Sequence, residues 1–106
     1  MIKKGETYII GEIGQNHNGS VDIAKLIVEL IARPVREETF GLDLKPMNAV
    51  KMTRRDLNEE LTTTQMNRIY DTPNSFGRTY GAHRAFLELD DHAHYEVYKF
   101  AKDKGL

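Results

Sequence analysis

Cysteine and tryptophan are absent from the 106 residues of this chain. The lack of cysteine excludes a disulfide framework and a thiolate metal site. Long apolar runs are also missing, since none approaches the roughly 18 residues that a membrane span requires. The start, residues 1–6, lacks the apolar core of a signal peptide. We therefore expect a cytoplasmic protein without membrane contact.

Net charge of either sign is nearly missing as well. Fifteen basic residues oppose sixteen acidic ones, which leaves a formal charge of −1. Without a positive field, non-specific nucleic-acid binding has no electrostatic driving force, so no nucleic-acid partner is expected. We interpret the short pair Arg54-Arg55 as a solvated or anion-facing local feature. The length fits one domain or a piece of a larger one.

Hydrophobic periodicity predicts two strands and an intervening helix. The apolar run over residues 8–13 indicates a fully buried strand. Ser20 is a good N-cap for a helix over residues 20–32. A second strand is expected over residues 47–53. The buried face of the helix is expected to carry Ile23, Leu26, Ile27, Leu30 and Ile31.

Two connecting segments read as mostly irregular. The charged residues 33–46 predict a surface excursion with a helical turn near residues 37–40. Residues 54–89 are long and polar, and a Thr-x-x-Gln capping box predicts one short helix over residues 62–70. Residues 71–77 have the composition of a loop.

A second helix is predicted to begin after Asp90 or Asp91, with Gly105 just beyond its end. Its aromatic residues are expected to pack in the core rather than to form a binding face. The order of strand, helix, strand, loop and helix gives two β/α units with parallel strands. One face of this helix is expected to carry His94, Val97, Tyr98 and Ala101, and the core aromatics are Tyr95, Tyr98 and Phe100.

The ends of the two strands carry opposite charges. Side chains alternate along a strand, so each strand has two different faces. One face of each is purely apolar, and the other face carries Glu12 on the first strand and Lys51 and Thr53 on the second. Neighbouring parallel strands are about 4.8 Å apart, which predicts that Glu12 and Lys51 meet at the carboxyl edge. An acid and a base there suit an anionic substrate and a proton transfer. The alternative is an ion pair that only neutralises two charges within the sheet.

The histidines give weaker signals. His17, in the loop after the first strand, either hydrogen-bonds a substrate or orders its own loop. His92 and His94 are two residues apart on a helix and do not face each other, so no metal site is expected. His83 is isolated and is expected at the surface.

The string Glu12-Ile13-Gly14-Gln15-Asn16-His17-Asn18-Gly19-Ser20 resembles the first strand and loop of the sialic acid synthase family. The resemblance implies an α/β fold, namely the first two β/α units of a truncated TIM (β/α)₈ barrel formed by residues 1–106. It implies a synthase that condenses phosphoenolpyruvate with an N-acetylated, N-acetylmannosamine-like sugar aldehyde to a nonulosonic acid. It also implies a divalent metal, Mn or Mg, whose ligands come from later strands.

The resemblance also assigns roles to individual residues. Glu12 inherits proton transfer at the developing alkoxide, and Lys51, in a Val-Lys-x-x string, inherits phosphoenolpyruvate binding. Thr53 stands where the family has a glutamine that contacts the acceptor sugar. Asn74 is the best match to an asparagine that reaches the sugar.

Other classes of function remain open. The chain is expected to be inactive alone, because it lacks the metal ligands. It is alternatively a non-catalytic α/β anion-binding or assembly module, or part of another barrel enzyme acting on phosphorylated sugars. An unpaired sheet edge also predicts a homo-oligomer. The excursion over residues 33–46 is expected on the amino-terminal side of the strands, away from the chemistry.

Overall fold

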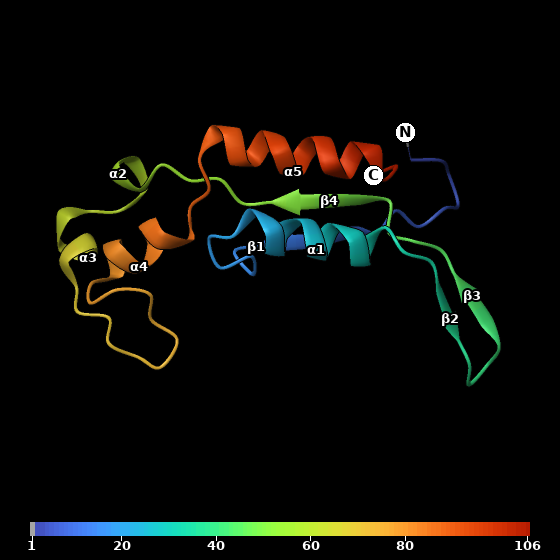
Figure 1. The fold of residues 1–106 in the computed structure, drawn as a ribbon, viewed down its shortest axis with the longest axis horizontal. Coiled ribbons are helices and arrows are strands. Elements are labelled where there is room, and N and C mark those ends of the chain that lie inside the picture. The colour runs from blue at the N-terminus through green and yellow to red at the C-terminus, as the bar shows by residue number, and fades with distance from the viewer. Residues whose placement is uncertain (1) are drawn as a thin grey trace.

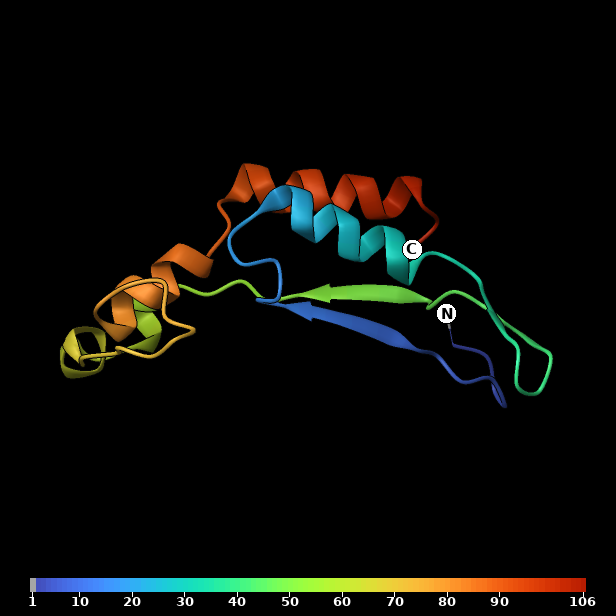
Figure 2. The same cartoon turned by 60° about the horizontal axis from the view of Figure 1, so that its bottom comes forward.

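A two-stranded parallel sheet covered on one face by two helices forms the centre of the molecule (Figures 1 and 2). The computed structural model describes residues 2–106. Strand β1 (Ile10–Gly14) pairs with β4 (Ala49–Met52), and helices α1 (Val21–Ile31) and α5 (Asp91–Asp103) lie side by side above them. The two predicted β/α units are confirmed as a mixed α/β arrangement. The complete barrel stays a prediction.

Alternation along β1 determines which side chains the helices cover. Gly11 and Ile13 are buried beneath the helices, whereas Ile10 and Glu12 lie exposed on the opposite face. The prediction of a fully buried strand over residues 8–13 is therefore wrong for the face of Ile10 and Glu12, and Tyr8 and Ile9, which precede β1, are exposed as well. In β4, Val50 and Met52 pack against the core below α5, as the alternation predicted.

The core consists of small and branched side chains from the sheet and both helices. Ser20 caps α1 by accepting a hydrogen bond from the backbone N–H of Ile23, as predicted. The predicted buried face is wrong for Ile23, Leu26 and Leu30, which are exposed. The buried side of α1 faces both the sheet and α5, so it is rotated toward its smaller residues. The buried cluster is Ile13, Ala24, Val28, Val97 and Ala101, with Ile27 and Ile31 packed against it.

Helix α5 begins and ends as predicted. Asp90 accepts a hydrogen bond from the backbone N–H of Ala93 at 2.8 Å. At the other end Gly105 has φ +89°, and the N–H groups of Gly105 and Leu106 bond back to α5 as in a Schellman motif. No helix within residues 2–106 is long and apolar enough to cross a membrane.

The aromatic residues of α5 divide between core and surface. Phe100 packs against the core, but Tyr95 and Tyr98 are 63% and 59% exposed, so their predicted core packing is wrong. They lie on the side of α5 that turns away from α1. A polar contact joins α5 to α1, since the Lys104 Nζ lies 2.7 Å from the Glu29 Oε2. This hydrogen bond lowers the pKa of the Glu29 carboxyl.

Residues 33–46 form a β-hairpin rather than the predicted helical turn. Strands β2 (Val35–Glu37) and β3 (Leu42–Leu44) pair antiparallel, and Gly41 adopts φ +66° in the connection. The Glu37 carboxylate accepts hydrogen bonds from the N–H groups of Thr39 and Phe40, which closes the turn and lowers the pKa of Glu37. The hairpin projects from the amino-terminal end of the sheet, on the predicted side (Figure 1).

Three short helices lie beyond the carboxyl end of the strands (Figure 1). They are α2 (Leu57–Glu60), α3 (Thr63–Asn67) and α4 (Tyr80–Leu87). The predicted capping box of α3 is confirmed at Thr62 and Gln65, although the helix ends at Asn67. Helices α2 and α4 were not predicted from the sequence. His83, predicted as an isolated surface residue, is half-buried and is not isolated, since it contacts the rings of Tyr70 and Phe76 and accepts a hydrogen bond from the N–H of Phe76.

Candidate functional site

Glu12 and Lys51 are direct neighbours across the parallel sheet. Their Cα positions pair in register, and the Lys51 Nζ lies 3.4 Å from the Glu12 Oε1. Both side chains are on the face opposite the helices, as the alternation predicted. They are 57% and 61% exposed, so the pair is not enclosed within the sheet. An exposed ion pair contributes at most about 1 kcal/mol to stability. A gain in stability therefore does little to explain why these two charged residues stand side by side.

A bulge follows this pair in β1. The register shifts between Glu12 and Gly14, and Gly14 has φ +56°. The extra residue turns the chain into the loop 15–19, while β4 continues as an extended segment toward α2. Bulges are common beside active sites because they redirect the chain locally. Here the bulge leaves Glu12 as the last residue of β1 in straight register with β4.

An open depression of about 550 Å³ contains the predicted strand-end residues. It brings Glu12, Lys51 and Thr53 together at the carboxyl edge. Arg55, which the sequence indicated as solvated or anion-facing, lines it as well, together with Glu60, which was not predicted as a site residue. Its full lining is Glu12, Lys51, Met52, Thr53, Arg54, Arg55 and Glu60.

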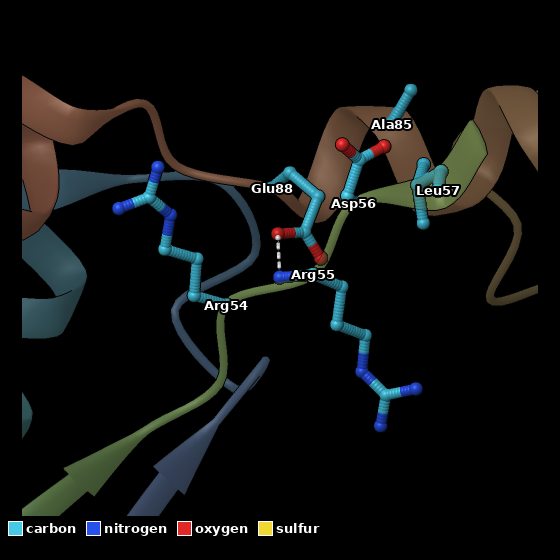
Figure 3. Close-up of a pocket in the computed structure, with 6 residues that line it drawn as sticks. All are labelled: Arg54, Arg55, Asp56, Leu57, Ala85 and Glu88. Atoms are coloured by element: carbon cyan, nitrogen blue, oxygen red, sulfur yellow. Dashed lines mark hydrogen bonds between the residues drawn. The ribbon is translucent and has the colours of Figure 1, made fainter. Parts of the chain in front are cut away.

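The two arginines of this edge point in opposite directions (Figure 3). The Arg54 guanidinium forms an ion pair with Asp91 at the start of α5. The Arg55 guanidinium pairs with Glu60 of α2. Glu60 lines the depression, so the guanidinium of Arg55, unlike that of Arg54, lies beside another lining residue.

Asn74 lies outside this depression. It borders a separate one of about 440 Å³ together with Gln15 and Asn18 of the β1 loop and with His83. Both depressions lie beyond the carboxyl ends of the strands. The structure thus brings Glu12, Lys51 and Thr53 together but does not place Asn74 with them.

His17 orders the loop after β1. Its side chain is 1% exposed, and its Nδ1 accepts a hydrogen bond from the N–H of Gly19 at 3.0 Å. Burial lowers the pKa of His17; the neighbouring His94 lowers it further and Glu88 raises it. Of the two predicted alternatives, this geometry supports loop ordering.

Glu88 is a site residue that sequence reasoning missed. One carboxylate oxygen accepts from Gln15 Nε2 at 3.1 Å. The other accepts from the backbone N–H of Arg55, also at 3.1 Å (Figure 3). It thereby joins the loops that follow β1 and β4. The signal in the sequence was a carboxylate placed between two apolar residues, Leu87 and Leu89, which are both buried.

Within residues 2–106, no three metal-ligating side chains gather in one place. These residues therefore do not fit the divalent metal that the family resemblance implies. The polar groups that line the depression around Glu12 are hydroxyl, carboxylate and cationic groups.

Comparison with curated proteins identifies relatives of the chain. The N-acetylneuraminate-9-phosphate synthases of Mus musculus and Homo sapiens are 31% and 29% identical over 103 and 99 residues. That of Drosophila melanogaster is 29% identical over 96 residues. The chain is homologous to the sialic acid synthases. The recognition of this family from the sequence is confirmed.

The chain spans about a quarter of the length of these synthases. The alignments cover 97%, 93% and 91% of the chain but 26%, 24% and 23% of the relatives. No family model matches the chain, and no solved structure gives a significant match. Because the Mus musculus alignment spans 103 of the 106 residues, both Glu12 and Lys51 lie within it.

Proposed function

We propose that this chain forms part of the active site of a sialic-acid-type synthase. The reaction joins phosphoenolpyruvate to an N-acetylated sugar aldehyde and yields a nonulosonic acid and phosphate. The observation that carries this proposal is the Glu12–Lys51 pair, in register at the carboxyl edge and open to solvent. The relatives support this proposal, since they are named as synthases of N-acetylneuraminate 9-phosphate.

The chemistry assigns one charge to each of the two residues. C3 of phosphoenolpyruvate attacks the aldehyde carbon, a carbon–carbon bond forms, and the aldehyde oxygen becomes an alkoxide that takes a proton. Water then adds to the cation at C2 and loses a proton, and phosphate leaves. Lys51 supplies a compact positive charge for the phosphoenolpyruvate anion. Glu12, beside it, is placed to carry a proton to or from the reacting oxygen.

Several groups that the reaction uses are not supplied by residues 2–106. The divalent metal that the family resemblance implies has no ligand set among them. Lys51 is the single strand-end cation on the Glu12 face of the paired strands. We therefore propose that these residues bind phosphoenolpyruvate weakly and show no turnover by themselves.

Titration of the purified chain with phosphoenolpyruvate, followed by NMR, tests the anion site. Lys51→Met should weaken binding at least tenfold, because it removes the cation. Glu12→Gln should strengthen binding, because it removes the carboxylate that competes for the Lys51 ammonium. Arg36→Gln is the matched control, since Arg36 is an exposed, ion-paired arginine in the distant hairpin. Equal binding by wild type and Lys51→Met would refute the proposal.

The outcome also separates the synthase from a simple binding module. A module that only retains anions should bind phosphate and phosphoenolpyruvate equally. A synthase site should prefer phosphoenolpyruvate and should respond to an added sugar aldehyde.

We further propose that the chain self-associates in a cytoplasmic setting. Tyr8, Ile9 and Ile10 are exposed where β1 enters the sheet, and within residues 2–106 β1 pairs only with β4. Open edges with apolar neighbours favour pairing between copies. Light scattering should give a mass above that of one chain, and a monodisperse monomer would contradict this.

A further inference from the structure

Both outer edges of the central sheet lack a partner strand within residues 2–106. The sheet has two strands, so β1 and β4 each have one free edge. The face opposite the helices is uncovered as well, since Ile10, Glu12 and Lys51 are all more than half exposed. Parallel strands occur almost only in sheets that are covered on both faces. A partner that completes this sheet therefore has to pair with two edges and cover the face that carries Glu12.

An apolar groove runs beside the free edge of β4. It has a volume of about 450 Å³ and lies between β4 and the side of α5 that is turned away from α1. Val50 and Met52 of the strand and Tyr98 of the helix line it, and Tyr98 is 59% exposed. Unpaired backbone groups beside exposed apolar side chains favour the addition of a strand and a helix from another molecule.

A complementary surface lies on the outer side of α1. Ile23, Leu26 and Leu30 are spaced three and four residues apart, so they form an apolar row on one side of this helix. They are 38%, 57% and 55% exposed. Lys25 and Glu29 occupy another side of α1, where they form ion pairs with α5. The apolar row is therefore turned away from α5, toward the side of the molecule where β1 has its free edge.

We propose that the chain assembles head to tail, with the free edge of β4 in one copy paired to the free edge of β1 in the next. Pairing in this order brings α1 of the second copy beside α5 of the first. The apolar row of α1 then packs against the groove beside β4. This inference rests on the self-association proposed above and specifies its geometry, but it does not depend on the proposed reaction.

The charges at the carboxyl edge favour this arrangement over the pairing of like edges. The register of Glu12 with Lys51 within one copy, repeated between copies, places each Lys51 between two glutamates. Opposite charges on neighbouring strands stabilise a sheet, whereas like charges destabilise it. Two β4 edges paired with each other would bring together strands whose single charged residue is Lys51. They would also leave both β1 edges uncovered.

Identical head-to-tail contacts produce either a closed ring or an open filament. A barrel of roughly eight strands closes around an interior that side chains just fill. Each copy supplies the two strands β1 and β4, so about four copies close the ring. Both helices lie on one face of the sheet and remain outside (Figure 2). Closure turns the opposite face inward and covers Ile10, which is 54% exposed in a single copy.

Two variants that each block one side of the contact test the inference. Leu26→Lys places a charge on the apolar row, and Tyr98→Lys places one in the groove. Wild type should have a mass about four times the 12.2 kDa of one chain. Each variant alone should require at least tenfold higher concentration to associate, because a charge buried in an apolar contact loses its hydration. Multi-angle light scattering after gel filtration measures these masses.

A mixture of the two variants distinguishes head-to-tail contacts from twofold-symmetric ones. Leu26→Lys retains an intact groove and Tyr98→Lys retains an intact row, so the mixture should form dimers with one copy of each. It should do so at concentrations at which either variant alone is monomeric. In a twofold-symmetric contact containing both residues, the two lysines would face each other and the mixture would stay monomeric. Native mass spectrometry with ¹⁵N-labelled Leu26→Lys identifies the mixed dimer.

Phe40→Lys is the matched control, because Phe40 is 79% exposed in the hairpin, away from the contact. It should retain the wild-type mass. Leu30→Lys and Tyr98→Glu repeat the test on each side, and far-ultraviolet circular dichroism checks that every variant is folded. A monomeric wild type, a mixture that stays monomeric, or an equal loss of association in Phe40→Lys would overturn the inference.

The inference and the proposed function fail separately. A discrete wild-type dimer would refute the head-to-tail contact and leave self-association standing. Titration of the same samples with phosphoenolpyruvate tests the proposed reaction by itself. Binding that depends on Lys51 in a chain that does not assemble head to tail would refute only this inference. A head-to-tail assembly whose phosphoenolpyruvate binding is unchanged in Lys51→Met would refute only the reaction.

Discussion

Glu88 holds the backbone N–H of Arg55 at 3.1 Å, across 33 positions of sequence. With its other oxygen the same carboxylate accepts from Gln15, in the loop after β1. One side chain thus fixes both loops that border the Glu12–Lys51 pair. Glu88 therefore links the two segments that leave the sheet at its carboxyl edge.

Glu88→Gln should destabilise the fold by about 1–2 kcal/mol, since an amide retains one acceptor oxygen and replaces the other with a donor. Urea unfolding followed by circular dichroism measures this change. Glu59→Gln, on the exposed surface of α2, is the matched control and should lie within about 0.5 kcal/mol of wild type. If neither variant changed the urea midpoint, the two hydrogen bonds of Glu88 would make no net contribution to the stability of the fold.

Stability should rise with pH across the range in which His17 titrates. Burial lowers the pKa of His17 below 6.5, so the folded state binds fewer protons than the unfolded state. The stabilising effect is fully present above about pH 6.5 and is lost as the pH falls toward the folded pKa. Urea midpoints measured from pH 5 to 8 should show this slope.

His17→Gln should flatten that pH dependence, because it removes the buried titrating group. His92→Gln should leave it unchanged, since the His92 side chain is 81% exposed. His94 and Glu88 influence the same group, so the comparison keeps both intact. If the urea midpoint still rose with pH in His17→Gln, a titrating group other than His17 would be responsible for the pH dependence.

Substitution of the strand-end pair should cost little stability. Both side chains are more than half exposed, so Glu12→Gln and Lys51→Met should each change the free energy of unfolding by less than about 1 kcal/mol. A pair that stabilises the sheet from a buried position would lose about 3–5 kcal/mol on removal of one partner. Urea denaturation distinguishes the two, and a large loss would favour the structural interpretation of the pair.

Gly19 should tolerate no side chain. It has φ +74°, and an added Cβ would lie 2.4 Å from the carbonyl oxygen of Phe86 on α4. Gly19→Ala should therefore cost well above the roughly 1–2 kcal/mol of a left-handed backbone alone. Gly5→Ala isolates that backbone cost, because Gly5 has φ +86° with open space around it. Equal melting temperatures of the two variants would contradict the contact between the β1 loop and α4.

Features determined by neighbouring residues were predictable from the sequence. The caps at Ser20, Thr62 and Asp90 depend on hydrogen bonds within three residues. The pairing of Glu12 with Lys51 followed from alternation in two strands once they were taken as parallel. These predictions required no knowledge of distant contacts.

Features determined by long-range packing were not predictable. The buried side of α1 depends on where α5 lies, so Leu26 and Leu30 are exposed despite their apolar spacing. Helix α4 is short and ends at Glu88, whose partners are far away in the sequence. The opposite directions of Arg54 and Arg55 depend on Asp91 and Glu60, which only the fold brings near.

The openness of the Glu12–Lys51 pair has an electrostatic consequence. At a water-facing position the effective dielectric constant is high, and dissolved ions screen the attraction within about 8–10 Å. A segment or substrate laid over the pair would exclude that water. The attraction between the two charges would then rise severalfold with neither residue moving. The attraction between Glu12 and Lys51 therefore depends on whether a segment or a substrate covers the pair.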